Sequence, residues 1–416
     1  MKKNGFIMST YVYILLVFFL LLLGTMLVVL NNTRLLANKI KENTDGNIDF
    51  NLILKGDKEI ILKKDSEYIE PGYIATTFDG KKLDVNVMGE VNVNKLGEYD
   101  IIYIAEYKGV EKKIRRKVIV AENLVTYITN LYKTNNILNN LKKDNTPDSN
   151  IRYYGSDPNN YVRFNNELWR IIGVFGNNVK LIRSEKLGDL SWDSSEESIN
   201  EGWGVNEWST SALKNYLNTM YYGGTSVTCY NAKNKQTTTC PTNKLNTESK
   251  TLIDYYTWKT GAIEMSKRTN TPAFYKSERG NVTGKICNGG SACNDTVERT
   301  TEWPGYIGLP YATDYAYASG ESICETNMVK QDSSNTYICK NNNWMFKPNT
   351  WYWTLSLDAY PSASRGVWLV HGVGSVANNN AAYGGAIFPA IYLKTDILIK
   401  SGTGRSNDPY ILKAGS

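Results

Sequence analysis

Histidine is almost absent from this chain of 416 residues, in which the single copy is His371. Hydrolases of the serine or cysteine type place a histidine beside a nucleophile and an orienting acid, and the sequence around His371 shows no such set. Structural zinc sites commonly combine histidines with closely spaced cysteines, and that combination is missing too. We therefore expect no catalytic residues, no metal and no cofactor. An enzyme acting on envelope or host glycans is the least favoured interpretation, because no pair of catalytic carboxylates is visible.

An excess of charge of one sign is also missing. The chain carries 47 Lys and Arg against 41 Asp and Glu, a net charge of +6, with no arginine-rich block or basic stripe. This balance gives little support to nucleic-acid binding. Asp193, Glu196 and Glu197 could offer carboxylate oxygens to calcium, but no EF-type loop contains them, which favours a solvated loop.

Cysteine does not occur before position 229, and all six copies lie between positions 229 and 339. An even number in one segment is typical of disulfide bridges formed in an oxidising compartment. The spacings C-x10-C, C-x5-C and C-x14-C do not match zinc sites, whereas reduced thiols are an alternative. Pairing of neighbours predicts three bridges: Cys229–Cys240, Cys287–Cys293 and Cys324–Cys339.

Residues 11–30 form a hydrophobic run without charge or proline. About 20 apolar residues cross a membrane as a helix, and this run exceeds the apolar core of a cleaved secretory signal. We predict a single membrane-spanning helix, with residues 1–10 as a cytoplasmic tail and residues 31–47 as a stalk. Because the flanking basic residues are nearly balanced, the cysteines decide the orientation and place the carboxy-terminal domains outside the cell.

Residues 48–121 show the alternating pattern of short β-strands separated by turn signals, which predicts an all-β sandwich. The stretches EYIEPGYIATTFDGKKL (67–83) and VNVNKLGEYDIIYIAEYKG (91–109) resemble the bacterial immunoglobulin-like repeat of surface proteins. That family's pattern has an acidic run after the alanine, whereas this chain has Thr76-Thr77-Phe78. The resemblance implies a spacer or adhesion module rather than an active site.

Residues 122–150 are predicted to be a helical connector, because Leu124, Tyr127, Ile128 and Leu131 fall on one helical face. Residues 151–416 are predicted to form a disulfide-stapled α+β domain. It opens with a strand meander, contains a helix at 208–222 capped by Ser209 or Thr210, and is mostly loops over 223–350.

Three stretches of the large domain carry a second resemblance: NNYVRFNNELWRIIGVF, ERTTEWPGYIGLPYATDYAYA and FPAIYLKTDILIKSGTGRSNDPYIL. Together they resemble an uncharacterised family of surface domains from Gram-positive, mostly gut-associated bacteria, over residues 122–416. The resemblance implies a fold similar to C-type lectins and to the formylglycine-generating enzyme. It implies no catalytic residues.

The amino terminus, KKNGFIMSTYVYILL, resembles a prepilin leader, which implies cleavage after Gly5 and a processed Phe6. Pilins carry a glutamate at the fifth mature position, where this chain has Thr10. A plain signal anchor is therefore favoured, and a pilin-like or envelope structural subunit is the alternative function.

Tryptophans are frequent beside Asn and Gly in the large domain, where exposed rings with amide neighbours suit sugar faces and hydroxyls. Core packing is the simpler explanation of the same residues. The candidate ligand-binding residues are Trp344, Trp351, Trp353, Trp303 and Tyr306. The sequence thus predicts a membrane-anchored cell-surface protein that binds a carbohydrate or protein ligand through its carboxy-terminal domain, with an Ig-like spacer.

Overall fold

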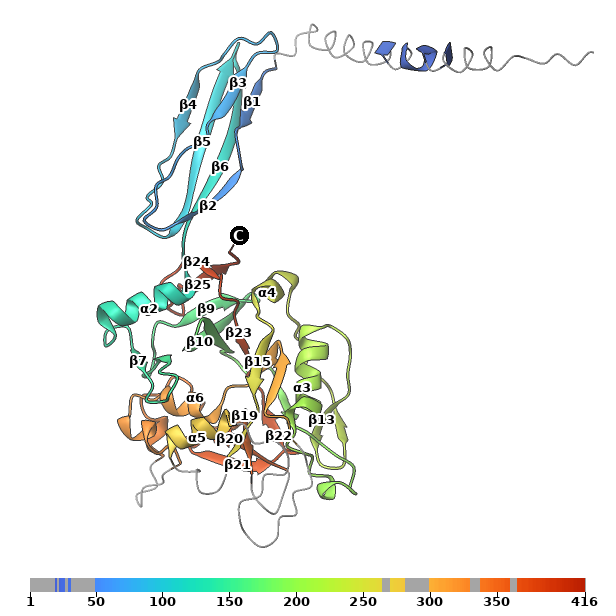
Figure 1. The fold of residues 1–416 in the computed structure, drawn as a ribbon, viewed down its shortest axis with the longest axis vertical. Coiled ribbons are helices and arrows are strands. Elements are labelled where there is room, and N and C mark those ends of the chain that lie inside the picture. The colour runs from blue at the N-terminus through green and yellow to red at the C-terminus, as the bar shows by residue number, and fades with distance from the viewer. Residues whose placement is uncertain are drawn as a thin grey trace, which may run out of the picture. The chain divides into compact units, whose positions relative to one another are not determined.

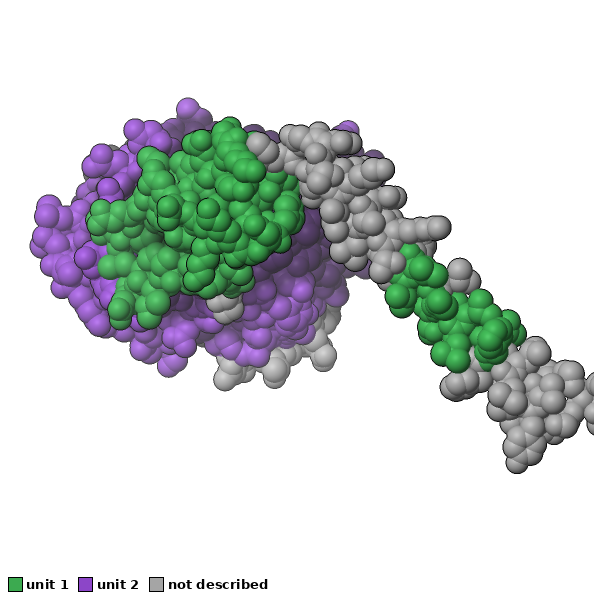
Figure 2. Space-filling model, turned by 90° about the horizontal axis from the view of Figure 1, so that it is seen from above, with its two compact units in different colours: residues 1–62, 66–93, 99–119 green, residues 63–65, 94–98, 120–416 purple. Residues whose placement is uncertain are grey.

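The chain forms two compact units (Figures 1 and 2). A computed structural model describes residues 19–20, 22–26, 29–30, 49–263, 270–280, 299–329, 337–359 and 365–415. Unit 1 comprises residues up to 62, 66–93 and 99–119; unit 2 comprises residues 63–65, 94–98 and 120–416. Figure 2 colours unit 1 green and unit 2 purple.

The predicted membrane segment 11–30 lies largely outside the described residues. Helix is described at residues 19–20, 22–26 and 29–30. Within the part of the chain that the structure describes, no helix has the length and apolar character to cross a membrane. The predicted stalk and the residues Gly5 and Phe6 fall on positions that the structure does not describe.

Unit 1 is built from antiparallel strands, as the alternating sequence predicts. The strands are β1 (Asn51–Leu54), β2 (Glu59–Lys63), β3 (Tyr73–Thr76), β4 (Val85–Met88), β5 (Gly97–Tyr107) and β6 (Val110–Asn123). β1 pairs with β3, while β5 lies between β4 and β6. Ile101, Tyr103 and Ala105 of β5 are buried on one face, so the period-two prediction for this strand is confirmed.

An arginine explains the E-P-G motif of unit 1. The Arg116 side chain is fully buried, and its Nε lies 3.1 Å from Oε1 of Glu70. It also donates to the carbonyls of Lys55, at 2.6 Å, and Gly72, at 3.0 Å. Glu70 in turn accepts the Gly72 amide at 2.8 Å. A buried charge needs a partner and full hydrogen bonding, and the motif supplies both.

Unit 2 contains a long, mostly antiparallel sheet. Its order is β18 (Ile307–Gly308), β23 (Ala390–Tyr392), β11 (Asn178–Arg183), β10 (Glu167–Phe175), β9 (Tyr161–Phe164), β25 (Tyr410–Lys413), β24 (Leu398–Ser401) and the end of β6. β8 (Ile151–Tyr153) pairs with β10 and with β7 (Leu141–Lys143). The predicted Asn165-Asn166 turn is confirmed, since both residues have positive φ between β9 and β10.

A second sheet of unit 2 is ordered β12 (Asp189–Ser191), β22 (Gly384–Ala386), β19 (Tyr352–Asp358), β20 (Gly366–Val370) and β21 (Val376–Asn380), with β16 (Ala262–Ile263) also on β19. Two small ladders join β13 (Cys229–Ala232) to β14 (Gln236–Thr238), and β15 (Tyr256–Lys259) to β17 (Glu302–Gly305). This mixture of sheets and short helices agrees with the α+β prediction.

The helices of unit 2 are short and lie beside the sheets (Figure 1). They are α2 (Leu124–Asn135), α3 (Ala212–Asn215), α4 (Thr247–Leu252), α5 (Thr271–Glu278) and α6 (Ala312–Tyr317). Single turns occur at Asn200–Gly202, Trp208–Thr210, Ser322–Glu325 and Ile338–Lys340, and a π-helical segment spans Tyr216–Tyr222. The amphipathic prediction for α2 is confirmed, because Leu124 and Ile128 are buried and Asn123 caps the helix.

One sequence prediction for this unit is wrong. The helix over 208–222 is broken, because Ser211 has extended backbone and caps α3 by accepting the Lys214 amide at 3.2 Å. The segment 223–350 is mostly loop where it is described, as predicted, but it also contains α4, α5, α6 and several short strands. α6 is buried along its whole length, so tertiary contacts rather than local propensity stabilise it.

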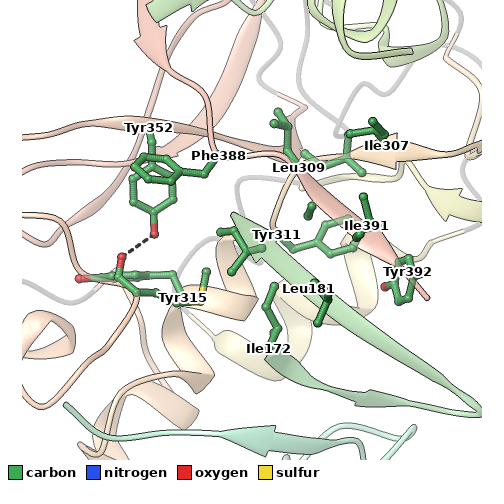
Figure 3. Packing of buried hydrophobic residues seen from close by; sticks show 14 of the residues in the cluster. Ile172, Leu181, Ile307, Leu309, Tyr311, Tyr315, Tyr352, Phe388, Ile391 and Tyr392 are labelled. Carbon is green, nitrogen blue, oxygen red and sulfur yellow. Dashed lines mark hydrogen bonds between the residues drawn. The ribbon is translucent and has the colours of Figure 1, made fainter. Parts of the chain in front are cut away.

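A single large core holds unit 2 together. Leu181 of β11 lies opposite Ile391 of β23, and Figure 3 shows Tyr311 close to both. Five tryptophans are fully buried in this core: Trp169, Trp192, Trp208, Trp258 and Trp353. The tryptophan-rich composition therefore serves packing first.

Candidate functional site

A cavity of about 290 Å³ opens in unit 2. We call it the tyrosine cavity. Its described lining residues are Asp148, Asn150, Phe175, Gly176, Tyr256, Lys259, Tyr275, Arg279, Tyr311 and Tyr392. A cavity of this size, with aromatic walls and a few polar groups, has the character of a small-molecule site.

Six separate parts of the fold position these side chains. β15 carries Tyr256 and Lys259, and α5 with its C-cap carries Tyr275 and Arg279. Tyr311 is the N-cap of α6. The three remaining sources are β23, the loop between β7 and β8, and the turn between β10 and β11, where Gly176 takes a φ of 60° that suits glycine. Because rigid elements hold most of the lining, the cavity is preformed.

Stacked tyrosines form one wall of the tyrosine cavity. The rings of Tyr256 and Tyr392 lie 3.7 Å apart with an interplanar angle of 20°. The Trp258 ring meets both at an edge, with centroid distances of 6.1 Å to Tyr256 and 4.9 Å to Tyr392. Tyr392 and Trp258 are buried, whereas Tyr256 is half-buried. Tyr256 therefore offers the reachable ring of the wall.

Arg279 lies flat against a second tyrosine. Its guanidinium carbon is 3.4 Å from the Tyr275 ring centroid and 4.7 Å from that of Tyr311. Its Nη1 lies 3.1 Å from Oε2 of the buried Glu278. Burial opposes the charged form, yet the neighbouring tyrosines and Glu278 raise the pKa of Arg279 above its usual value. The guanidinium is therefore a fixed cation with 16% of its side chain exposed.

Polar groups complete the lining. The Tyr275 hydroxyl donates to Oδ2 of Asp148 at 2.7 Å and accepts from Nδ2 of Asn150 at 2.9 Å. The Tyr311 hydroxyl donates to the carbonyl of Lys259 at 2.8 Å. These contacts fix the rings, and Asp148, Asn150 and Lys259 add a carboxylate, an amide and an ammonium group to the lining.

A buried ion network lies behind the aromatic wall. Nζ of Lys180 is 2.6 Å from Oδ2 of Asp314 and 4.2 Å from the Tyr311 ring centroid. Arg152 pairs with the same aspartate and, at 2.8 Å, with Asp144. Burial lowers the pKa of Lys180 to about 8, although Asp314 favours its charged form. This network is a structural support for Tyr311, because its charges are buried beneath the ring.

Two of the tryptophans predicted to bind a ligand are core residues. Trp344 is 5% exposed, and its indole nitrogen donates to the carbonyl of Tyr153 at 3.0 Å. Trp353 is fully buried and donates to the carbonyl of Leu190 at 3.0 Å. The prediction of an exposed platform is wrong for both, because each ring face is covered and each N–H is already satisfied.

The other three predicted residues do not line the tyrosine cavity. Trp351 is half-buried and meets Trp353 edge-on at 5.4 Å, and Gly385 has no Cβ that would clash with the pair. Trp303 meets the buried Trp208 at 5.9 Å. Both tryptophans contribute packing rather than cavity surface.

Tyr306 belongs to a small aromatic cluster outside the tyrosine cavity. It stacks on Tyr222 at 4.1 Å and meets Tyr255 at 4.9 Å. Tyr255 is 58% exposed. This cluster is the nearest match in the structure to the platform that the sequence predicted around Trp303 and Tyr306.

No residue of the tyrosine cavity was predicted from the sequence as a site residue. The lining comes from positions between 148 and 392, so no local spacing connects them. The available signal was the abundance of tyrosine, 29 copies against 10 of phenylalanine. Buried tyrosines place a hydroxyl beside an apolar ring, which is the composition of this cavity.

Two predicted bridges are present: Cys229–Cys240 and Cys324–Cys339. The third pair, Cys287 with Cys293, lies outside the described residues. Each bridge closes a short segment of unit 2, which agrees with the stapling role expected from the sequence.

Asp193 and Glu196, which were considered as calcium ligands, bind other groups of the protein. Oδ2 of Asp193 accepts the Val205 amide at 2.8 Å, and Oδ1 accepts the Ala212 amide at 3.0 Å. Glu196 pairs with Lys235 at 2.9 Å. Among the described residues no group of acidic, histidine or cysteine side chains is arranged to hold a metal ion.

Comparison with known proteins gives a family match for part of the chain. Residues 52–120 match the model of the bacterial surface protein Ig-like domain. No curated protein matches the chain. One similar solved structure is the crystal structure of the lipoprotein BT2262 from Bacteroides thetaiotaomicron, which is 36% identical over 18% of this chain, with a TM-score of 0.17. The match covers 39% of that protein, so the chain spans well under half of its length.

Proposed function

We propose that this chain is a bacterial cell-surface binding protein, in which unit 1 is a spacer and unit 2 binds a saccharide in the tyrosine cavity. The stacked pair Tyr256 and Tyr392 carries the proposal. The apolar face of a sugar ring packs on an exposed aromatic ring, while its hydroxyls need directional polar partners. Asp148, Asn150 and Lys259 line the same cavity and offer both donors and acceptors.

The surface location is supported by the Ig-like match of residues 52–120. The disulfides of unit 2 point the same way, because such bridges persist in oxidising compartments. We propose that residues 11–30 anchor the chain as a single-pass helix, with both units outside the cell. Protease added to intact cells should then digest the chain beyond about residue 45. Protection of both units until lysis would contradict this topology.

A glycan array probed with the full chain tests the binding proposal. Tyr256→Ala should lose the bound glycans, because it removes the reachable ring of the wall. Tyr255→Ala is the matched control, because this neighbouring tyrosine lies outside the cavity and is 58% exposed. Melting temperatures of both variants should stay close to the wild-type value. Loss of binding in Tyr255→Ala alone, or equally in both variants, would place the site elsewhere and contradict the proposal.

A further inference from the structure

Arg279 is held in a way that leaves part of it free to bind. Its flat face rests on the Tyr275 ring, so the guanidinium plane is fixed. Within the described residues its hydrogen-bond partners, the Glu278 carboxylate and the Tyr275 carbonyl, are both contacted by Nη1. Nε and Nη2 have no partner there. Because guanidinium donors lie in the plane of the group, stacking on a ring does not block them.

An edge of two parallel N–H groups suits one kind of ligand. Nε and Nη2 of an arginine match the two oxygens of a carboxylate, and charge-assisted bidentate pairs are stronger than neutral hydrogen bonds. Stacking pre-organises the group, so little side-chain freedom is lost on binding. The neighbouring Lys259 adds a second cation to the lining, although its Nζ also pairs with Glu302.

Asp148, the acidic residue of the lining, can bind a different part of the ligand. Asp148 already accepts the Tyr275 hydroxyl through Oδ2 at 2.7 Å. Its remaining lone pairs can accept from a ligand hydroxyl. A ligand with hydroxyls at one end and a carboxylate at the other would therefore satisfy Asp148 and Arg279 together, while its ring rests on Tyr256.

We propose that the tyrosine cavity recognises an acidic saccharide, whose carboxylate binds the free edge of Arg279. This inference rests on the proposed function and names its ligand class. A uronic or sialic acid has the required chemistry: a ring, hydroxyls and one carboxylate. The polar lining and the volume of about 290 Å³ fit one such residue rather than a long chain buried end to end.

Calorimetry with the full chain tests the carboxylate. Glucuronate and glucuronamide have nearly the same shape, and the amide lacks the charge. We expect glucuronate to bind at least tenfold more tightly, and N-acetylneuraminate serves as a second acidic probe. Arg279→Lys keeps the charge but loses the bidentate edge, so it should weaken glucuronate binding about tenfold and leave the amide unchanged. Arg163→Lys, an exposed arginine outside the cavity, is the control.

The possible failures can be told apart. If glucuronate and glucuronamide bind equally and Arg279→Lys changes neither, the carboxylate inference is wrong while the saccharide proposal stands. If phenylacetate binds in an Arg279-dependent way and no saccharide binds, the saccharide proposal is wrong and the carboxylate site stands. If none of these probes binds, both are wrong. Should Arg279→Lys fail to fold, the double variant Glu278→Gln/Arg279→Gln removes both members of the ion pair and should show the same loss.

Discussion

Lys180 and Asp314 form an ion pair in which neither side chain is exposed, with Nζ of the lysine 2.6 Å from Oδ2 of the aspartate. The pair joins strand β11 to helix α6, and Oδ1 of the same aspartate meets Arg152 of β8. One carboxylate thus neutralises two buried cations. Burial opposes its charge, but the two cations hold the pKa of Asp314 at about 2. The Asp314 carboxylate therefore stays ionised across the physiological range.

Replacing Asp314 should strongly destabilise unit 2. Asp314→Asn leaves two buried cations with reduced compensation, and breaking such a pair costs about 3–5 kcal/mol. Asp189→Asn is the control, because Asp189 pairs with Lys186 at the same 2.6 Å but both side chains are about half exposed. An exposed pair contributes at most about 1 kcal/mol. Urea denaturation of both variants measures the difference, and equal losses of the free energy of unfolding would show that burial of the ion pair does not determine its contribution.

Two neighbouring tryptophans should respond differently to truncation. Trp353→Ala removes a fully buried ring and its hydrogen bond, so the free energy of unfolding should fall by about 3–5 kcal/mol. Trp351→Ala removes a half-buried ring whose contacts include the edge of Trp353, and its loss should be less than half as large. Thermal melts test this. A larger loss for Trp351 would contradict the burial that the structure assigns to the two rings.

Asp193 should make stability depend on pH in the acidic range. Burial raises its pKa to about 6, although the Val205 and Ala212 amides favour the charged form. A group with a raised folded-state pKa binds its proton more tightly when folded, so its contribution is greatest below the unfolded value and is lost as pH rises through 6. Relative to Asp193→Asn, the wild-type free energy of unfolding should fall by about 2 kcal/mol between pH 4 and pH 6.

The matched measurement is urea unfolding of both proteins at intervals across that range. The asparagine variant cannot titrate at this position, so its curve supplies the background from all other groups. A constant difference between the two curves would mean that Asp193 titrates at its ordinary value and is better hydrated than the structure shows.

Disulfide mapping checks the cysteine pairing. Non-reducing peptide maps should contain Cys229–Cys240 and Cys324–Cys339, and we also predict Cys287–Cys293. Short loops of this kind stabilise a domain by roughly 3 kcal/mol each in the chain-entropy model. Serine replacement of both Cys324 and Cys339 should lower the melting temperature of unit 2. A peptide joining cysteines from different pairs would contradict the local pairing.

The strands of unit 1 could be predicted because their pattern is local. Ile101, Tyr103 and Ala105 alternate with more exposed neighbours on β5, so the period of two reveals both the element and its buried face. The apolar face of α2 was visible for the same reason. Where one face of a strand or helix is buried and the other is solvated, the pattern of apolar and polar residues reveals that face.

The tyrosine cavity could not be predicted, because it depends on contacts between distant segments. α6 is buried all round and has no amphipathic period, so its six residues carry no helical signal of their own. Trp353 and Tyr256 are both aromatic residues in strands, yet the first is sealed in the core and the second reaches the cavity. Only the tertiary packing around each ring distinguishes them.

The strand β25 has a consequence for how the protein is made. It pairs in parallel with β9, which lies near the beginning of unit 2, and its other neighbour β24 pairs with the end of β6. Non-local pairings of this kind close slowly. During synthesis, β9 keeps an open edge until β25 has been made, and an open edge invites association with other chains. The new chain is therefore most prone to aggregate before β25 is in place, so chaperones that delay folding should increase its yield.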